Sequence, residues 1–171
     1  MKIFWNRIVR VLRLEKQVFE EVEADQTALP QALGLVILAS FASGIATISG
    51  GLDASLFSGT LGSLIGWFVM SYIIYFVGAR ILPEPQTKAD YGQLLRTIGF
   101  ATAPGLIAVF GIIPFLYTIS ALVASVWMLI AIVIAVRQAL DYTSTGRAII
   151  VSVIGWIIYA LLAWVFRVIV H

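Results

Sequence analysis

Apolar and polar positions divide the chain into a short N-terminal part with helical periodicity and four long runs without charge. The runs cover Gln26 to Leu52, Ala54 to Ala79, Thr97 to Val136 and Ala148 to Phe166. A helix needs roughly 20 apolar residues to cross a hydrocarbon core about 30 Å thick. The pattern therefore predicts an all-α integral membrane bundle.

The third run is too long for one helix. Its 40 residues, from 97 to 136, would extend about 60 Å, roughly twice the bilayer thickness. Gly111-Ile112-Ile113-Pro114 is a strong turn signal near the middle, because proline cannot continue a helix. We therefore expect two spans in this run and five transmembrane helices in all, at about 29–49, 56–81, 94–111, 115–136 and 147–167.

Local signals mark several ends of these spans. The stretch from Gly50 to Asp53 is predicted to be a turn, and Pro83-Glu84-Pro85 ends the second span. Thr87-Lys88-Ala89-Asp90 fits a capping box, in which the threonine and the acid satisfy free backbone N–H groups. The next helix is therefore predicted to begin near Lys88.

Residues 2–23 have the pattern of one amphipathic helix within an N-terminal unit, 1–27, that precedes the transmembrane unit at 28–171. Its apolar arc includes Phe4, Ile8, Val11, Leu12, Val18, Phe19 and Val22. We expect this helix to lie on the cytoplasmic interface or to pack under the bundle. The alternative is a docking helix for a soluble partner.

The basic residues indicate the orientation, because cytoplasmic loops carry an excess of lysine and arginine. With five spans and the N-terminus inside, ten of the 11 basic residues lie inside and only Arg167 lies outside. If the third segment were re-entrant, leaving four spans, the count would be nine against two. The charge bias favours a cytoplasmic N-terminus and a C-terminus on the opposite side.

Composition supports a membrane protein and offers little chemistry. The 171 residues are 61% hydrophobic and 12% charged, with net charge +2 and no cysteine, and the mean hydropathy is +1.01. The dispersed basic residues give no nucleic-acid footprint. The one histidine is the last residue, and the acidic residues lie outside the span interiors. We therefore expect no catalytic residues, no metal and no cofactor, and thus a protein that is not an enzyme.

Small residues at four-residue spacing predict close helix packing in a membrane. They are Ser40 and Gly44 in the first span, and Ser58, Gly62 and Gly66 in the second. Such a stripe can face another helix of this chain or a second subunit, so a homo-oligomer is left open. Pro104-Gly105 should break the third span near its middle. The break serves packing and kinking, or alternatively a ligand or ion site.

Three short motifs stand out in the membrane part: YGQLLRTIGFATAP at 91–104, VRQAL at 136–140 and TGRA at 145–148. In these motifs the chain resembles the Yip-one domain family, the Ypt/Rab-interacting membrane proteins and their bacterial relatives, over roughly residues 28–170. In that family a Gly-Tyr pair followed by proline marks the third span. The corresponding residues here are Gly99-Phe100 with Pro104, and Gly105 follows.

The resemblance implies five membrane helices, a cytoplasmic N-terminus and protein partners on that side, with a role in membrane organisation or trafficking. Phe100 lacks the usual tyrosine hydroxyl, and the family's Asp-Leu-Tyr-Gly-Pro-type motif before the first span is absent. The N-terminal region is one short helix, which favours a prokaryotic plasma-membrane protein over a secretory-pathway member. We expect a non-enzymatic scaffold or partner-binding protein in the lipid bilayer. The alternative is a channel or transporter for a small or lipid-like solute at the kinked third span.

Overall fold

The computed structural model describes residues 2–49 and 56–170, which form helices joined by short connections. The turn predicted at 50–53 lies outside the described residues. The elements are α1 (Lys2–Leu12), α2 (Lys16–Ala24), η1 (Gln26–Ala28), α3 (Leu29–Ser49), α4 (Leu56–Tyr75), η2 (Phe76–Ile81), α5 (Tyr91–Phe100), η3 (Ala103–Ile112), η4 (Pro114–Leu116), α6 (Tyr117–Ala139) and α7 (Thr145–Val170). Five segments of the described chain are long and apolar enough to cross a membrane. The predicted all-helical membrane bundle is confirmed.

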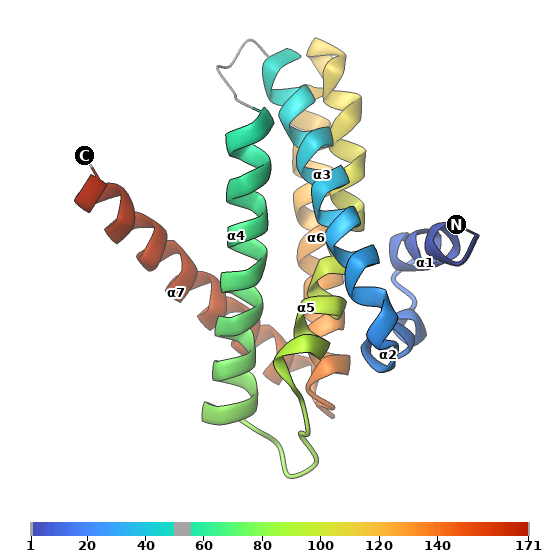
Figure 1. Ribbon diagram of the computed structural model, residues 1–171, viewed down its shortest axis with the longest axis vertical. Helices are drawn as coiled ribbons and strands as arrows, with labels where there is room; N and C mark the ends of the chain where they lie inside the picture. Colours follow the sequence, from blue (N-terminus) through green and yellow to red (C-terminus); the bar gives the residue numbers. More distant parts are fainter. Residues whose placement is uncertain (1, 50–55, 171) are drawn as a thin grey trace.

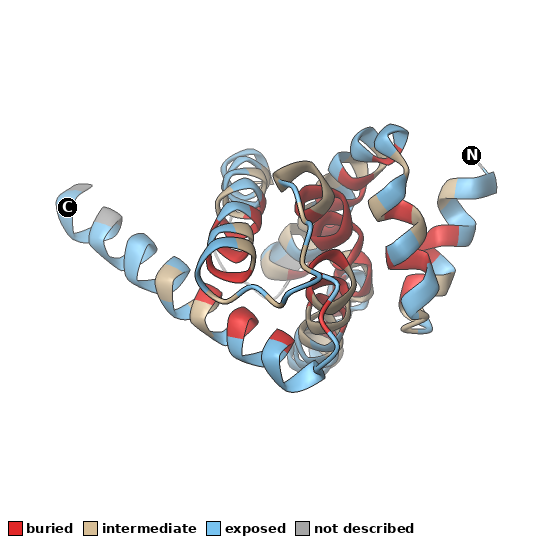
Figure 2. Ribbon diagram, turned by 90° about the horizontal axis from the view of Figure 1, so that it is seen from below, coloured by how far each residue is buried: buried red, intermediate tan, exposed pale blue. Residues whose placement is uncertain are grey.

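The third crossing, made of α5 and η3, forms the centre of the bundle. It is packed among α3, α4 and α6, whereas α7 leaves the bundle obliquely (Figure 1). In its most apolar stretch, 67% of the residues are buried, against 18% in that of α7. Seen along the bundle, buried residues gather in the middle and the far half of α7 is exposed (Figure 2). The third crossing, which contains the break at Pro104-Gly105, is therefore the core of the protein.

The third crossing changes helix type halfway. The α-helix α5 ends at Phe100, and the 3₁₀-helix η3 begins at Ala103 with Pro104 in its first turn. The Gly105 N–H donates to the Thr102 carbonyl at 2.8 Å, so the chain tightens directly after the break. The crossing ends where Ile113 becomes extended. The break expected at Pro104-Gly105 is therefore a switch from α-helix to 3₁₀-helix.

Glycines of the third crossing pack against alanines of α3. The contacts pair Gly99 with Ala32, Gly105 with Ala39, and Gly111 with Ala46. The glycines recur every six residues and the alanines every seven. Two turns of a 3₁₀-helix take six residues and rise about 12 Å, and two turns of an α-helix take about seven and rise about 10.5 Å. The two periods match well enough for three successive contacts, which we call the Gly–Ala seam.

The seam leaves no room for a side chain on Gly99 or Gly111. A Cβ atom at Gly99 would lie 2.7 Å from the Ala32 Cβ, and one at Gly111 would lie 2.9 Å from the Ala46 Cβ. Real Cβ atoms do not approach a neighbour this closely. Because no hydrophobic effect drives helices together within lipid, such close backbone approach supplies the packing attraction.

The stripe of small residues predicted in the first two spans does not form one continuous packing surface within the chain. Ser40 and Gly44 do face α4: the Ser40 Oγ lies 3.3 Å from the Thr60 Oγ1, and a Gly44 Cβ would lie 2.6 Å from Leu56. Gly62, however, is exposed, and among the described residues nothing lies within 4 Å of a Cβ placed there.

The other two members of the stripe on α4 have different surroundings. Gly66 faces α7, where a Cβ would lie 2.7 Å from the Tyr159 hydroxyl. Ser58 is exposed. Contact of Gly62 with a second subunit stays a prediction.

The single N-terminal helix predicted over residues 2–23 is wrong, because the chain turns back between α1 and α2. Leu14 has φ 58°, and the N–H groups of Leu14 and Glu15 donate to the carbonyls of Val11 and Arg10. This is a Schellman motif, which usually has glycine at the left-handed position. The same motif ends α6, with Asp141 at φ 52°. Because neither position holds glycine, no local turn signal predicted the first turn.

The helix start predicted near Lys88 is also wrong. The capping box lies three residues later, at Asp90–Gln93. The Asp90 carboxylate accepts from the Gln93 N–H at 2.9 Å, and the Gln93 side chain accepts from the Asp90 N–H. Helix α5 therefore begins at Tyr91. The Thr87 hydroxyl instead donates to the Leu140 carbonyl at 2.8 Å and joins two loops.

The Gly–Ala seam predicts different effects on stability for alanine at Gly111 and at Gly62. We expect Gly111→Ala to lower the free energy of unfolding by about 1–3 kcal/mol, because the new methyl group meets Ala46. Gly62→Ala meets nothing, and alanine favours helix by up to about 1 kcal/mol over glycine, so this variant should be as stable or more stable. Unfolding in detergent micelles measures both. Equal stability of the two variants contradicts the seam.

Candidate functional site

The N-terminal hairpin, residues 2–24, is packed against the bundle by its apolar face. Ile8 and Val11 of α1 are buried, and so are Val18, Phe19 and Val22 of α2. Phe4 and Leu12 are partly buried and pack against the same core. Of the two placements expected for the apolar arc, the membrane interface or packing under the bundle, the structure shows packing against the bundle.

Arg7 holds the two helices of the hairpin to the start of α3. Its side chain is only 6% exposed. The guanidinium donates to Glu21 at 2.8 Å, to Asp25 at 2.7 Å and to Gln31 at 3.1 Å. A buried charge is tolerated when it is paired and fully hydrogen-bonded, and all three nitrogens of Arg7 have partners. This arginine thus fixes the angle at which α1 lies.

Arg96 joins the hairpin to the third crossing. From α5, its Nε donates to the Val22 carbonyl at 3.0 Å, and its Nη2 donates to the Glu23 carbonyl. These carbonyls are at the end of α2, where a helix has no internal donors left and carries partial negative charge. A guanidinium placed there satisfies both carbonyls and the local dipole. Arg96 is 7% exposed, so water cannot readily replace it.

Glu23 is the titratable group at this joint. Its carboxylate accepts from the Gln93 side chain at 3.1 Å. Burial, followed by the negative charge of Asp141, raises the pKa of Glu23 to about 7; Glu20 and Asp90 act in the same direction and Arg96 opposes them. The docked hairpin therefore binds a proton more tightly than a released one does.

The loops 82–90 and 140–144, at the same end of the molecule as the hairpin, are joined by hydrogen bonds. The Tyr142 hydroxyl lies 2.8 Å from the carbonyl oxygens of both Gly78 and Leu82, at the π-helical end of the second crossing. Burial raises the pKa of Tyr142 to about 12, so it stays a donor. Glu84 accepts from the Thr143 N–H at 3.0 Å and from its hydroxyl at 2.9 Å. The loops and the hairpin together form one polar end of the molecule, held together by these hydrogen bonds.

The outer face of α1 is left uncovered by these contacts. Ile3, Trp5 and Val9 are exposed, by 65%, 54% and 44%, and basic Lys2 and Arg13 flank them. Helix α1 lies across the bundle axis, beside the lower half of α3 (Figure 1). An aromatic and aliphatic face flanked by basic residues, lying across the axis of the spans, suits the headgroup layer of a membrane or a partner at that depth.

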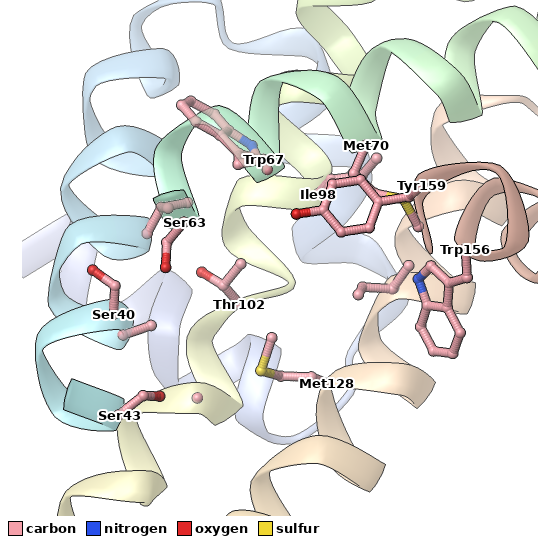
Figure 3. A pocket seen from close by; sticks show the side chains of 15 residues that line it. Ser40, Ser43, Ser63, Trp67, Met70, Ile98, Thr102, Met128, Trp156 and Tyr159 are labelled. Atoms are coloured by element: carbon pink, nitrogen blue, oxygen red, sulfur yellow. The ribbon is translucent and has the colours of Figure 1, made fainter. Parts of the chain in front are cut away.

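A second candidate site lies inside the bundle, beside the break in the third crossing. It is a crevice of ≈ 320 Å³ with walls from α3, α4, α6 and α7 and from Ile98, Thr102 and Gly105 of the third crossing. Most of the lining is apolar, with Met70 and Met128 and the α7 residues Trp156 and Tyr159 on one side (Figure 3). Of the four predicted motif residues, Gly105 lines it, whereas Gly99, Phe100 and Pro104 are buried in packing.

Two structural groups were not found by sequence reasoning. Arg7 lies on the apolar arc between Phe4 and Val11, and an arginine on an apolar face was a signal that it is buried with partners. The second group is the seam alanines Ala32, Ala39 and Ala46, whose signal in the sequence is a seven-residue repeat. Among the described residues, no group of three histidine, aspartate or glutamate side chains could hold a metal ion. The expectation of no catalysis stays a prediction.

Comparisons with known proteins give one match. The family model of the Yip1 domain matches residues 9–166. The match begins at Val9, within α1, and ends within α7, so it includes the end of α1, all of α2 and most or all of each of the five crossings. No curated protein and no solved structure matches the chain.

Removing Arg96 should release the hairpin. In Arg96→Met, two buried carbonyls of α2 lose a charged donor, a loss of about 1.5–3 kcal/mol per hydrogen bond. Spin labels on cysteines at Asn6 and Thr118 would report this as a broadened distance distribution, in a chain without native cysteine. Arg147→Met is the control, since Arg147 is exposed and donates to Pro83 rather than to the hairpin. An unchanged distribution in Arg96→Met would contradict the bracing role.

Docking of the hairpin should depend on pH through Glu23. Its pKa is about 7 in the folded state against 4.5 ordinarily. The stabilisation is therefore fully present below pH 4.5 and is lost as the pH rises through about 7. The same spin-label pair should broaden over this window, and Glu23→Gln, which keeps an acceptor for Gln93, should remove the effect. A pH response that survives Glu23→Gln would assign it to another group.

Proposed function

Since the chain belongs to the Yip1 domain family, we propose that it is a non-enzymatic membrane protein that organises the bilayer by binding protein partners through its N-terminal hairpin. The observation that carries this proposal is the bracing of the hairpin. Buried Arg7 and Arg96 fix both of its helices, so the exposed face of α1 is held in one orientation. A surface held in this way binds with less loss of conformational entropy than a free helix does.

The proposal places the hairpin on the cytoplasmic side. The hairpin lies at the same end as the loops 82–90 and 140–144, because α2 is hydrogen-bonded to Gln93 and Gln138, at the ends of α5 and α6 beside these loops. Ten of the 11 basic residues belong to this end or to the span ends beside it, which is the distribution expected of a cytoplasmic face. The C-terminus then lies on the opposite side. That the membrane is a prokaryotic plasma membrane stays a prediction.

A channel or transporter for polar solutes receives less support. Solute paths through a membrane commonly need charged or strongly polar side chains to replace water. The side chains that line the crevice include hydroxyl groups but no charged group. Lipid-like molecules remain compatible with such a lining.

Photo-crosslinking tests the proposed function. A photoreactive amino acid at Val9, on the outer face of α1, should give a discrete protein adduct in native membranes. The same residue at Val153 is the matched control, because Val153 is a valine of equal exposure, 45% against 44%, on α7. The adduct should disappear in Trp5→Asp, which leaves the buried contacts of Ile8 and Val11 in place. If Val9 yields lipid adducts alone, as Val153 is expected to, the partner-binding role is wrong.

A further inference from the structure

The crevice beside the break lies near the middle depth of the spans. Ser40 lies near the centre of α3, Thr102 near the centre of the third crossing, and Met128 near the centre of α6. The crevice reaches the molecular surface, since Ser43, Ser63 and Tyr159 line it and are exposed. At this depth the surrounding solvent is the hydrocarbon of lipid chains rather than water.

Three of the five hydroxyl groups that line the crevice donate to backbone carbonyls of their own segments. The Ser40 hydroxyl donates to the Ile37 carbonyl at 2.8 Å, that of Ser63 to Gly59 at 2.9 Å and that of Thr102 to Gly99 at 2.7 Å. The indole N–H of Trp67 donates to the Leu95 carbonyl at 3.0 Å. These donors are thus used by the backbone, and the surface that they leave toward the crevice is one that hydrocarbon can contact without breaking a hydrogen bond.

The other side of the crevice is formed by adaptable apolar groups. Met70 and Met128 supply flexible thioethers, and Trp156 and Tyr159 supply flat aromatic surfaces from α7 (Figure 3). Thioethers fit irregular apolar shapes well. Tyr159 lies over Gly66, where any Cβ would collide with its hydroxyl. That glycine therefore lets α7 approach α4 and close one side of the crevice.

We propose that this crevice binds one saturated hydrocarbon chain of a lipid, which enters from the bilayer between α3, α4 and α7. An empty crevice would forfeit the dispersion contacts of its walls. Water is a poor occupant, because a buried water needs two to four polar partners. A chain of methylene groups needs none. The inference does not rest on the proposed partner-binding function, and its test involves no protein partner.

The test uses the full-length protein in lipid nanodiscs with two probes that carry a photoreactive diazirine near the end of a saturated chain. One probe is a free fatty acid and the other is phosphatidylcholine with the same chain. We expect saturable adducts on the crevice walls, near Thr102 and Met128. Adducts with the phospholipid assign the site to a bilayer lipid, and adducts with the fatty acid alone assign it to a free single-chain molecule.

A matched pair of serines supplies the control. Ser63→Phe should fill the crevice and abolish the saturable adducts. Ser125→Phe should leave them unchanged, because Ser125 is likewise an exposed serine bonded to its own helix, at 2.7 Å from the Ala121 carbonyl, but is outside the crevice. Should Ser63→Phe fail to fold, Ser43→Phe fills the crevice from α3. Labelling spread evenly over exposed apolar positions, or unchanged in a folded filled variant, would overturn the proposal.

Discussion

Close approach between α3 and the third crossing is the constraint on which the rest of the structure depends. Glycines at 99, 105 and 111 meet alanines at 32, 39 and 46. A Cβ atom would lie 2.7 Å from its alanine at Gly99, 2.9 Å at Gly111 and 3.2 Å at Gly105. The 3₁₀ winding after Thr102 keeps Gly105 and Gly111 on one side, because a 3₁₀-helix repeats every three residues, and Gly99 precedes it at the end of α5. The break at Pro104 is therefore what allows the central crossing to be so deeply buried.

The same central crossing supplies the anchor for the hairpin and one wall of the crevice. Arg96 lies on α5, at the polar end, and binds the end of α2. Thr102 and Gly105, further along, face the crevice. A displacement of this crossing would therefore alter both candidate sites together. This coupling is geometric, and it gives the two sites a common physical basis without requiring a common ligand.

Much of the fold could be predicted from run length and charge, because lipid permits few alternatives to a helix of about 20 residues. The 40 charge-free residues required two crossings, and Pro114 lies in the connection between them. The turn at Leu14 could not be predicted, since its left-handed conformation is held by Schellman hydrogen bonds and tertiary packing without a glycine. The packing contact expected at Gly62 is not found within the described chain, because spacing alone does not say whether a small residue meets a neighbour. The crevice depends on how five helices pack, which no local pattern contains.

The pairing of Gly105 with Ala39 is the most direct measurable consequence of the seam, because a Cβ at Gly105 would lie 3.2 Å from the Ala39 Cβ. The chain has no native cysteine, so a double variant, Ala39→Cys with Gly105→Cys, can report this contact by disulfide formation under mild oxidation in membranes. The account predicts rapid and nearly complete crosslinking, with none when Gly62→Cys replaces Ala39→Cys. Absence of the 39–105 crosslink, or equal crosslinking from position 62, would contradict it.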